Sequence, residues 1–215
     1  MTPEAVVRDE SRTERKKREK LTRIMRTARQ LFERKGFDAT TMREIAAKAD
    51  IGHGTLFLYA RSKEDLLVMM FRDEVGRAVD EAIATVPRRR ALIDQLLHVL
   101  GALVSHHERN VALARVFVKE LPFVDDTRHG VAAFMANLLT HMAELIAGAQ
   151  AAGELATEPP PKLLASNVFA IFFSVLQRWL GHQRIDAAER DSLIRARIAL
   201  QLECFRGKTG RRASR

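Results

Sequence analysis

Residues 36–67 read GFDATTMREIAAKADIGHGTLFLYARSKEDLL, and this stretch predicts a helix–turn–helix unit. Thr41 and Glu44 have the spacing of a capping box, so a helix is expected to begin there. The segment 50–54 contains two glycines, which break a helix and permit a sharp change of direction. A short helix is then expected over 55–60, and Ser62 caps the next one. Such a unit can place a helix in the DNA major groove.

The residues before this stretch predict a supporting helix over 21–35. Its apolar residues recur at i, i+4, i+7 and i+8, which gives one apolar stripe, and Gly36 suits the left-handed position that ends a helix. Residues 12–20, RTERKKREK, have mixed charge and no apolar face. We expect 1–20 to be a flexible basic arm, with 12–20 either disordered or a frayed extension of the helix. Such an arm can reach a DNA minor groove.

The same N-terminal part of the chain resembles the TetR (tetracycline-repressor-like) family of bacterial transcription regulators. The matching residues are Phe32, Gly36, Phe37, Thr40, Thr41, Ile45, Ala46, Ala49, Gly54, Thr55, Leu56, Ser62, Lys63, Glu64 and Leu66.

Four positions depart from the family pattern. The family usually has Gly where Asp50 stands, Ser where Gly52 stands, and Phe or Val where Ala60 stands. It usually has Tyr in place of Phe57, and that Tyr commonly offers its hydroxyl to a phosphate. Phe57 has no hydroxyl, so we expect Tyr59 to make this contact instead.

The resemblance and the local pattern together predict a DNA-contacting set. Thr41, Tyr59 and Lys63 are expected on the DNA backbone, Lys63 because a helix N-terminus with a lysine suits a phosphate. A second group, His53, Gly54, Thr55 and Leu58, is expected to face the major groove. The full set is Thr40, Thr41, Arg43, His53, Gly54, Thr55, Leu58, Tyr59 and Lys63.

The distribution of charge favours a polyanionic partner. The net charge is +9, with 16 basic and 11 acidic residues in 1–65 and five basic residues in 206–215. The rest of the chain is close to neutral. Phosphate neutralisation supplies sequence-independent affinity, so double-stranded DNA fits this pattern. The basic tail 206–215 is expected to be disordered and to aid solubility.

Composition favours a cytoplasmic protein with no membrane span. The single cysteine, Cys204, allows no intramolecular disulfide, which fits a reducing compartment. The N-terminus is charged and lacks the apolar core of a signal peptide. The most apolar run, 163–176, includes polar residues and is shorter than the roughly 20 residues that a membrane span needs.

The remaining sequence predicts helices over 63–85, 91–108, 110–121, 127–151, 161–182 and 186–205. The expected fold is therefore all-α, with a three-helix DNA-binding domain over 21–66 and a larger helical domain over 67–205 for effector binding and dimerisation. The last two helices are apolar on much of their circumference, which indicates burial on more than one side. The resemblance implies that they form a four-helix bundle in a homodimer. Its two recognition helices would then lie about 34–36 Å apart on an approximate palindrome.

The resemblance also implies an effector cavity in the larger domain. Candidate lining residues are polar or aromatic side chains within apolar helices, namely His98, Phe117, Phe134, Asn137, His141, Asn167, Phe172, Gln177 and Trp179. An apolar or aromatic effector would suit them. His106 and His107 are adjacent and should point to different faces of a helix, so no metal site is expected, and no cofactor is indicated.

The reading that these features favour is a homodimeric, ligand-responsive repressor. A helical enzyme is disfavoured because no catalytic constellation occurs at a defining spacing. A small-molecule or lipid-binding helical protein with weak or lost DNA binding remains an alternative, because Phe57 and Gly52 each lack a hydroxyl that the family uses.

Overall fold

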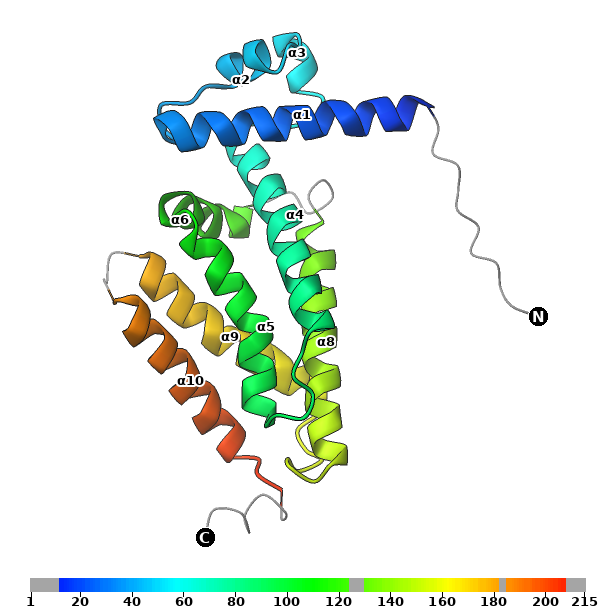
Figure 1. The fold of residues 1–215 in the computed structure, drawn as a ribbon, viewed down its shortest axis with the longest axis vertical. Helices are drawn as coiled ribbons and strands as arrows, with labels where there is room; N and C mark the ends of the chain where they lie inside the picture. The colour runs from blue at the N-terminus through cyan, green and yellow to red at the C-terminus, as the bar shows by residue number, and fades with distance from the viewer. Residues whose placement is uncertain (1–11, 124–129, 182–184, 208–215) are drawn as a thin grey trace, which may run out of the picture. The chain divides into compact units, whose positions relative to one another are not determined.

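The computed structural model describes residues 12–123, 130–181 and 185–207, and these confirm the predicted all-α fold (Figure 1). Within these ranges the only β pairing is an isolated bridge between Leu155 and Arg206. The chain divides into two compact units, Met1–Met70 and Phe71–Arg215. The boundary lies four residues beyond the predicted limit at 66 and falls inside a helix, because the apolar run that opens that helix belongs to the core of the first unit.

The first unit contains α1 (Arg12–Lys35), α2 (Met42–Lys48), α3 (His53–Leu56) and the start of α4 (Lys63–Ala84). The predicted stripe of α1 is buried and packs on α2, which in turn contacts α3. Leu56 and Ala60 close this small core from the other side of the turn.

The helix α1 begins nine residues earlier than the predicted start at residue 21, so of the two alternatives for 12–20 the structure has the extension of the helix rather than the disordered arm. Lys, Arg and Glu have high helix propensity, and Arg15 forms an i,i+4 ion pair with Glu19 at 3.7 Å. These local preferences are sufficient to extend a helix that tertiary packing stabilises further along. Residues 1–11 lie outside the described residues.

The turns of the first unit follow the predicted chemistry. Thr41 and Glu44 form the capping box: the Glu44 N–H donates to Thr41 Oγ1, and the Thr41 N–H donates to Glu44 Oε2 at 2.9 Å. The Lys35 ammonium, followed by the Thr41 hydrogen bonds, lowers the pKa of Glu44 to about 2. Gly36 has φ +88° and ends α1 as expected. Asp50 has φ 51°, which explains why a glycine also suits this position.

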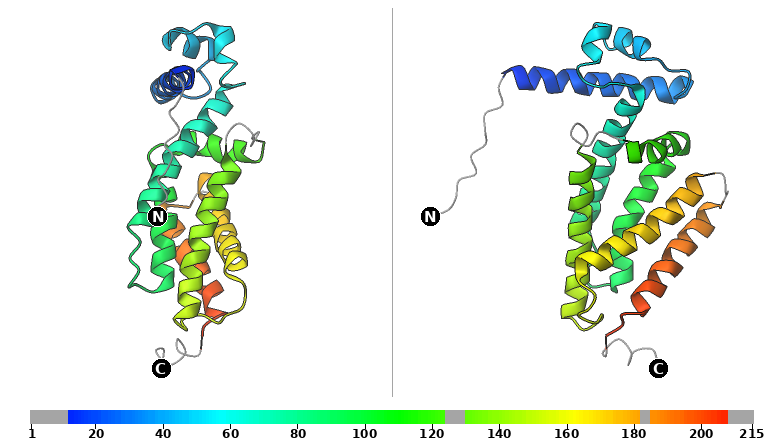
Figure 2. Two further views of the ribbon diagram at one scale, coloured as in Figure 1. Left: turned by 90° about the vertical axis from the view of Figure 1, so that its right-hand side faces the viewer. Right: turned by 180° about the vertical axis from the view of Figure 1, so that it is seen from behind.

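The second unit is a helical bundle of the rest of α4 with α5 (Leu92–Glu108), α6 (Val111–Glu120), the 3-10 turn η1 (Leu121–Phe123), α8 (Val131–Ala151), α9 (Pro161–Leu180) and α10 (Ala187–Glu203). The helix α9 packs along both α8 and α10, and α5 contacts α6, α8 and α10 (Figure 2). The predicted helix boundaries hold within about two residues, except at the start of α8, where the predicted start at 127 lies outside the described residues.

Residues 206 and 207, which were predicted to belong to a disordered tail, are held by backbone contacts. Arg206 pairs with Leu155, and the Gly207 N–H donates to the Glu154 carbonyl at 3.0 Å. A short backbone contact therefore fixes the chain just after α10, and 208–215 lie outside the described residues.

Two helices of the bundle, α8 and α9, are long and apolar enough to cross a membrane by length and composition alone. Core helices of soluble proteins pass the same test. Here the two helices pack against each other.

Candidate DNA-binding surface and effector cavity

The helix α3 presents a solvent-exposed face. His53, Gly54 and Leu58 are exposed, Leu58 by 76%, whereas Leu56 is buried. The helix starts at His53 with Gly52 as N-cap, two residues earlier than the sequence predicts. Phe57 is also exposed, and its ring meets the His53 ring edge-on at 5.0 Å between centroids. The face therefore contains an apolar ring that the sequence-based set omitted.

The threonines at the start of α2 differ in their surroundings. Thr41 is exposed, as expected for a residue beside DNA, and so is Arg43. Thr40 is only 1% exposed, and its hydroxyl donates to the Gly36 carbonyl at 2.8 Å. The Thr40 side chain closes the α1–α2 loop, so these contacts do not support the DNA contact predicted for it. Thr55 is half-buried on α3, beside the exposed face.

Lys63 is held by the protein itself. Its ammonium donates to the carbonyls of Phe37 at 2.9 Å and Asp38 at 3.1 Å, and it lies 4.5 Å from the centre of the Phe37 ring. These contacts tie the start of α4 to the loop before α2. Two of its three donors are used internally, so Lys63 has a role in positioning the loop, and its contact with a phosphate stays a prediction.

Replacing Lys63 with Ala should lower the free energy of unfolding by about 1.5–3 kcal/mol, the range for hydrogen bonds to a charged group. Urea unfolding followed by circular dichroism measures this. Lys48→Ala is the matched control, because Lys48 is an exposed lysine on α2. If Lys63→Ala leaves the stability unchanged and makes operator binding less dependent on salt, then Lys63 contacts a phosphate and does not position the loop.

A basic depression adjoins α3. It is lined by Thr13, Lys16, Lys17, Lys20, Leu58 and Tyr59. The early turns of α1 thus place lysines beside Tyr59, which is half-buried and carries the hydroxyl that Phe57 lacks. The described residues therefore combine α3 and the N-terminal end of α1 into one surface of positive charge, although no lysine of α1 was predicted to lie there.

The second unit contains an apolar cavity of 290 Å³ between α4, α5, α6, α8 and α9. Aromatic and aliphatic side chains form most of its wall, which is lined by Arg72, Val75, Leu103, His107, Phe117, Val118, Leu121, Pro122, Val131, Phe134, Met135, Phe169, Phe172, Phe173 and Leu176. The Phe71 and Phe117 rings stack behind it with centroids 4.8 Å apart. Its composition is that of a site for a small apolar molecule.

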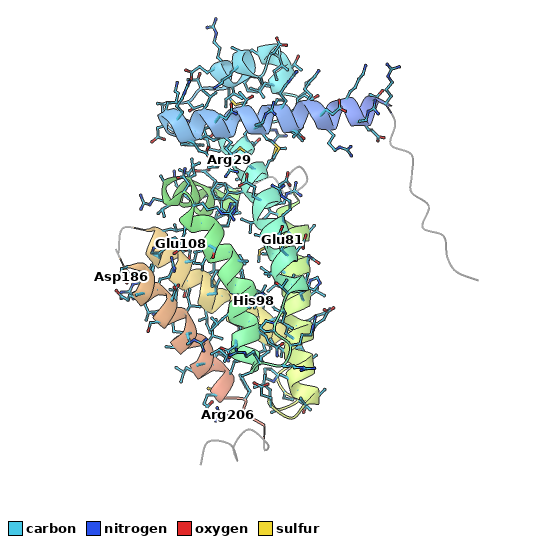
Figure 3. The ribbon with its side chains drawn as sticks, viewed as in Figure 1. Arg29, Glu81, His98, Glu108, Asp186 and Arg206 are labelled. Atoms are coloured by element: carbon cyan, nitrogen blue, oxygen red, sulfur yellow. The ribbon has the colours of Figure 1, made fainter. Side chains whose placement is uncertain are left out.

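The structure places only part of the predicted ligand set at this cavity. Phe117, Phe134 and Phe172 line it. The remaining six do not, because their side chains lie on other faces of their helices: His98, Asn137, His141, Asn167, Gln177 and Trp179. Figure 3 marks His98 on α5, where it is exposed and meets the Thr85 hydroxyl at 3.1 Å. The sequence criterion failed because polar residues within these helices mostly mark solvent-facing positions.

His107 is the polar residue of the cavity wall that the sequence-based set missed. It is 2% exposed, and its Nδ1 hydrogen-bonds to the Leu103 carbonyl. Burial lowers the pKa of His107, and the bond to Leu103 opposes that shift only in part. The sequence did contain a signal, since Leu96, Leu100, Leu103 and His107 follow helical spacing on one buried face.

His106 and His107 do not form a metal site. His106 lies beside Glu74, with Nε2 and Oε2 3.5 Å apart, and both histidine rings contact Phe71. In the described ranges, no group of three or more potential ligands could hold a metal ion.

A second cavity of 580 Å³ lies between α5, α9 and α10 and is lined partly by charged residues. Its buried Arg190 bonds to Glu108 and Asp191, each at 2.8 Å, and stacks 4.4 Å from the Trp179 ring. Glu108 lies near the end of α5, and Asp186 caps α10 by accepting the Glu189 N–H (Figure 3). The Arg190–Glu108 ion pair joins α10 to α5, so these charged residues of the wall have a structural role.

Comparison with known proteins identifies the class of protein to which this surface and this helical bundle belong. Residues 24–70 match the family of bacterial regulatory proteins of the tetR type. An HTH-type transcriptional regulator of Bacillus subtilis, YerO, is 36% identical over 84 residues, which span 36% of this chain and 29% of YerO.

Solved structures cover more of the chain. The Thermus thermophilus FadR repressor, crystallised with lauroyl-CoA, has a TM-score of 0.70 and 26% identity, over 85% of this chain and 93% of that one. A structure from Shewanella sp. PV-4 assigned to the tetR family has a TM-score of 0.57 and 30% identity, over 88% of this chain and 99% of that one. The fold and the exposed surface of α3 are therefore those of a helix–turn–helix regulator. The chain belongs to the TetR family of bacterial regulatory proteins.

Proposed function

We propose that this protein is a cytoplasmic, homodimeric repressor that leaves an approximately palindromic operator when an apolar effector enters the 290 Å³ cavity. Two features of the chain carry the proposal. The first unit has an exposed α3 beside a basic depression, and the second unit has an apolar cavity. An effector must prefer the conformation that binds DNA poorly, because only differential affinity shifts such an equilibrium.

The dimer is proposed to form through α9 and α10. Leu163 and Leu200 are large apolar side chains that remain exposed on these helices. On α10 the partly or fully exposed Leu193, Ala196 and Leu200 follow helical spacing, which gives a stripe that a second copy can cover.

The effector is proposed to be a molecule with an apolar body. A cavity of 290 Å³ has room for about ten groups of water size, each about 30 Å³. Arg72 lies at the wall and supplies a positive charge, with Nη2 2.8 Å from Asp73. An amphipathic ligand with an anionic end fits this arrangement, and the lauroyl-CoA bound to the Thermus thermophilus relative is of this class.

A gel-shift assay with the protein's own promoter region, and scrambled DNA as competitor, tests the proposal. Specific binding that acyl-CoA thioesters of graded chain length weaken is the expected result. Ligand binding with no DNA binding under any condition would favour the alternative, a helical ligand-binding protein that has lost its operator.

Replacing Tyr59 with Phe should weaken operator binding about two- to twelvefold, because one hydroxyl-to-phosphate bond contributes about 0.5–1.5 kcal/mol. The ring is retained, so the thermal unfolding curve should not change. Fluorescence anisotropy with labelled operator measures the affinity. Adding Phe57→Tyr to this variant returns a hydroxyl to the position that the family uses and should recover part of the affinity. Unchanged binding by Tyr59→Phe would exclude the contact.

A further inference from the structure

The wall of the effector cavity contains a buried hydrogen-bond acceptor with no donor among the described residues. This atom is Nε2 of His107, whose side chain lines the cavity and is almost wholly buried. The neighbouring wall consists mainly of phenylalanine rings, with the Phe117 ring centre 5.8 Å from that of His107. A phenyl ring offers no N–H or O–H, so these neighbours leave the nitrogen unsatisfied.

The hydrogen bond at the other ring nitrogen fixes the role of Nε2. The Leu103 carbonyl can only accept, so Nδ1 must carry the proton and donate it. A second proton on Nε2 would place a charge in an apolar wall, which burial disfavours. Nε2 therefore carries a lone pair. Because Nδ1 turns back toward the α5 backbone, Nε2 lies on the side of the ring away from that backbone.

An unsatisfied buried acceptor is costly, and a bound molecule that donates to it removes the cost. A ligand of the same shape without a donor displaces solvent from the cavity and leaves the nitrogen unpaired. Sites built around such a group discriminate strongly between ligands that differ by one hydroxyl. A plain alkyl chain fills the apolar volume but cannot bond to His107.

We propose that the effector of this protein carries a hydroxyl or N–H donor on its apolar body, and that Nε2 of His107 accepts that hydrogen bond. The inference rests on the proposed role of the cavity as the effector site and specifies the ligand class. A saturated acyl chain can still enter the cavity, but an apolar body that carries such a donor is expected to bind more tightly. His107 is thereby the residue that determines specificity.

Calorimetry on the full-length protein with two isomeric probes tests the inference. In para-butylphenol the oxygen is a donor, whereas in para-propylanisole it is an ether that cannot donate. The wild-type protein should bind the phenol about tenfold more tightly, within the range set by one unsatisfied buried group. This comparison needs no mutant, so it does not depend on how a variant folds.

The variant His107→Leu should lose the preference for the phenol, because leucine is close in size but offers no acceptor for the phenol hydroxyl. His98→Leu is the matched control, since His98 is an exposed histidine on the same helix, and it should keep the wild-type preference. Equal affinities in the wild-type protein, a preference that survives in His107→Leu, or no binding of either probe would each overturn the inference. If the preference is present but neither probe alters operator affinity, the role of His107 stands and the proposed repressor mechanism fails.

Discussion

Replacing Gly54 with Asp should abolish specific operator binding while leaving the fold intact. Gly54 is exposed on α3, and a Cβ built on it meets no atom within 4 Å. A carboxylate in the first turn of a helix is favourable for the helix itself. If α3 contacts DNA as proposed, the same carboxylate faces phosphates, and like charges brought together across an interface cost several kcal/mol. We expect the operator dissociation constant to rise about 100-fold or more.

Gly148→Asp is the matched control for this variant. Gly148 is an exposed glycine of α8 with equally open surroundings, so the control adds the same charge to a helix of the second unit. Fluorescence anisotropy gives both affinities, and circular dichroism shows whether each variant is folded. If Gly54→Asp binds the operator like Gly148→Asp, then α3 does not approach DNA.

Replacing Leu200 with Glu should dissociate the proposed dimer and abolish tight operator binding with it. Leu200 is 69% exposed on α10, so the change leaves the core of the single chain untouched. In a twofold dimer each substitution occurs twice, and each would bury an unpaired carboxylate in an apolar interface. We expect the dimer dissociation constant to rise by about 100-fold or more, since hot-spot residues contribute about 2 kcal/mol or more each.

Sedimentation equilibrium measures the dimer constant, and gel shift measures the consequence for DNA. Phe123→Glu is the control, because Phe123 is a large apolar residue of the second unit that is 80% exposed and lies on η1 rather than on α9 or α10. A Leu200→Glu protein that remains dimeric would place the interface elsewhere.

The local features of this protein were predictable because their causes are close together in sequence. The Thr41–Glu44 capping box, the left-handed Gly36 and the Ser62 cap each depend on residues within one helical turn. The family resemblance added the function of the first unit, which no local pattern specifies.

Features that depend on distant contacts were harder to predict. The resemblance and the local pattern predict a DNA contact for Thr40, but only the packed loop shows that its hydroxyl donates to the Gly36 carbonyl. Lys63 was interpreted through its position at a helix start, and its partners Phe37 and Asp38 lie more than two dozen positions earlier. In the cavity, side-chain polarity was a poor guide, because the face of each helix decides what a residue meets.

The aromatic residues described above give each unit its own optical signal. The chain has a single tyrosine and a single tryptophan; Tyr59 belongs to the first unit and Trp179 to the second. Trp179 stacks on the buried Arg190, so its emission should change when α9 and α10 separate. Tyrosine absorbance can follow events at the first unit in the same sample. The two units need not unfold together. Recording both signals shows whether a single midpoint of the unfolding transition describes the whole chain, and no added dye is required.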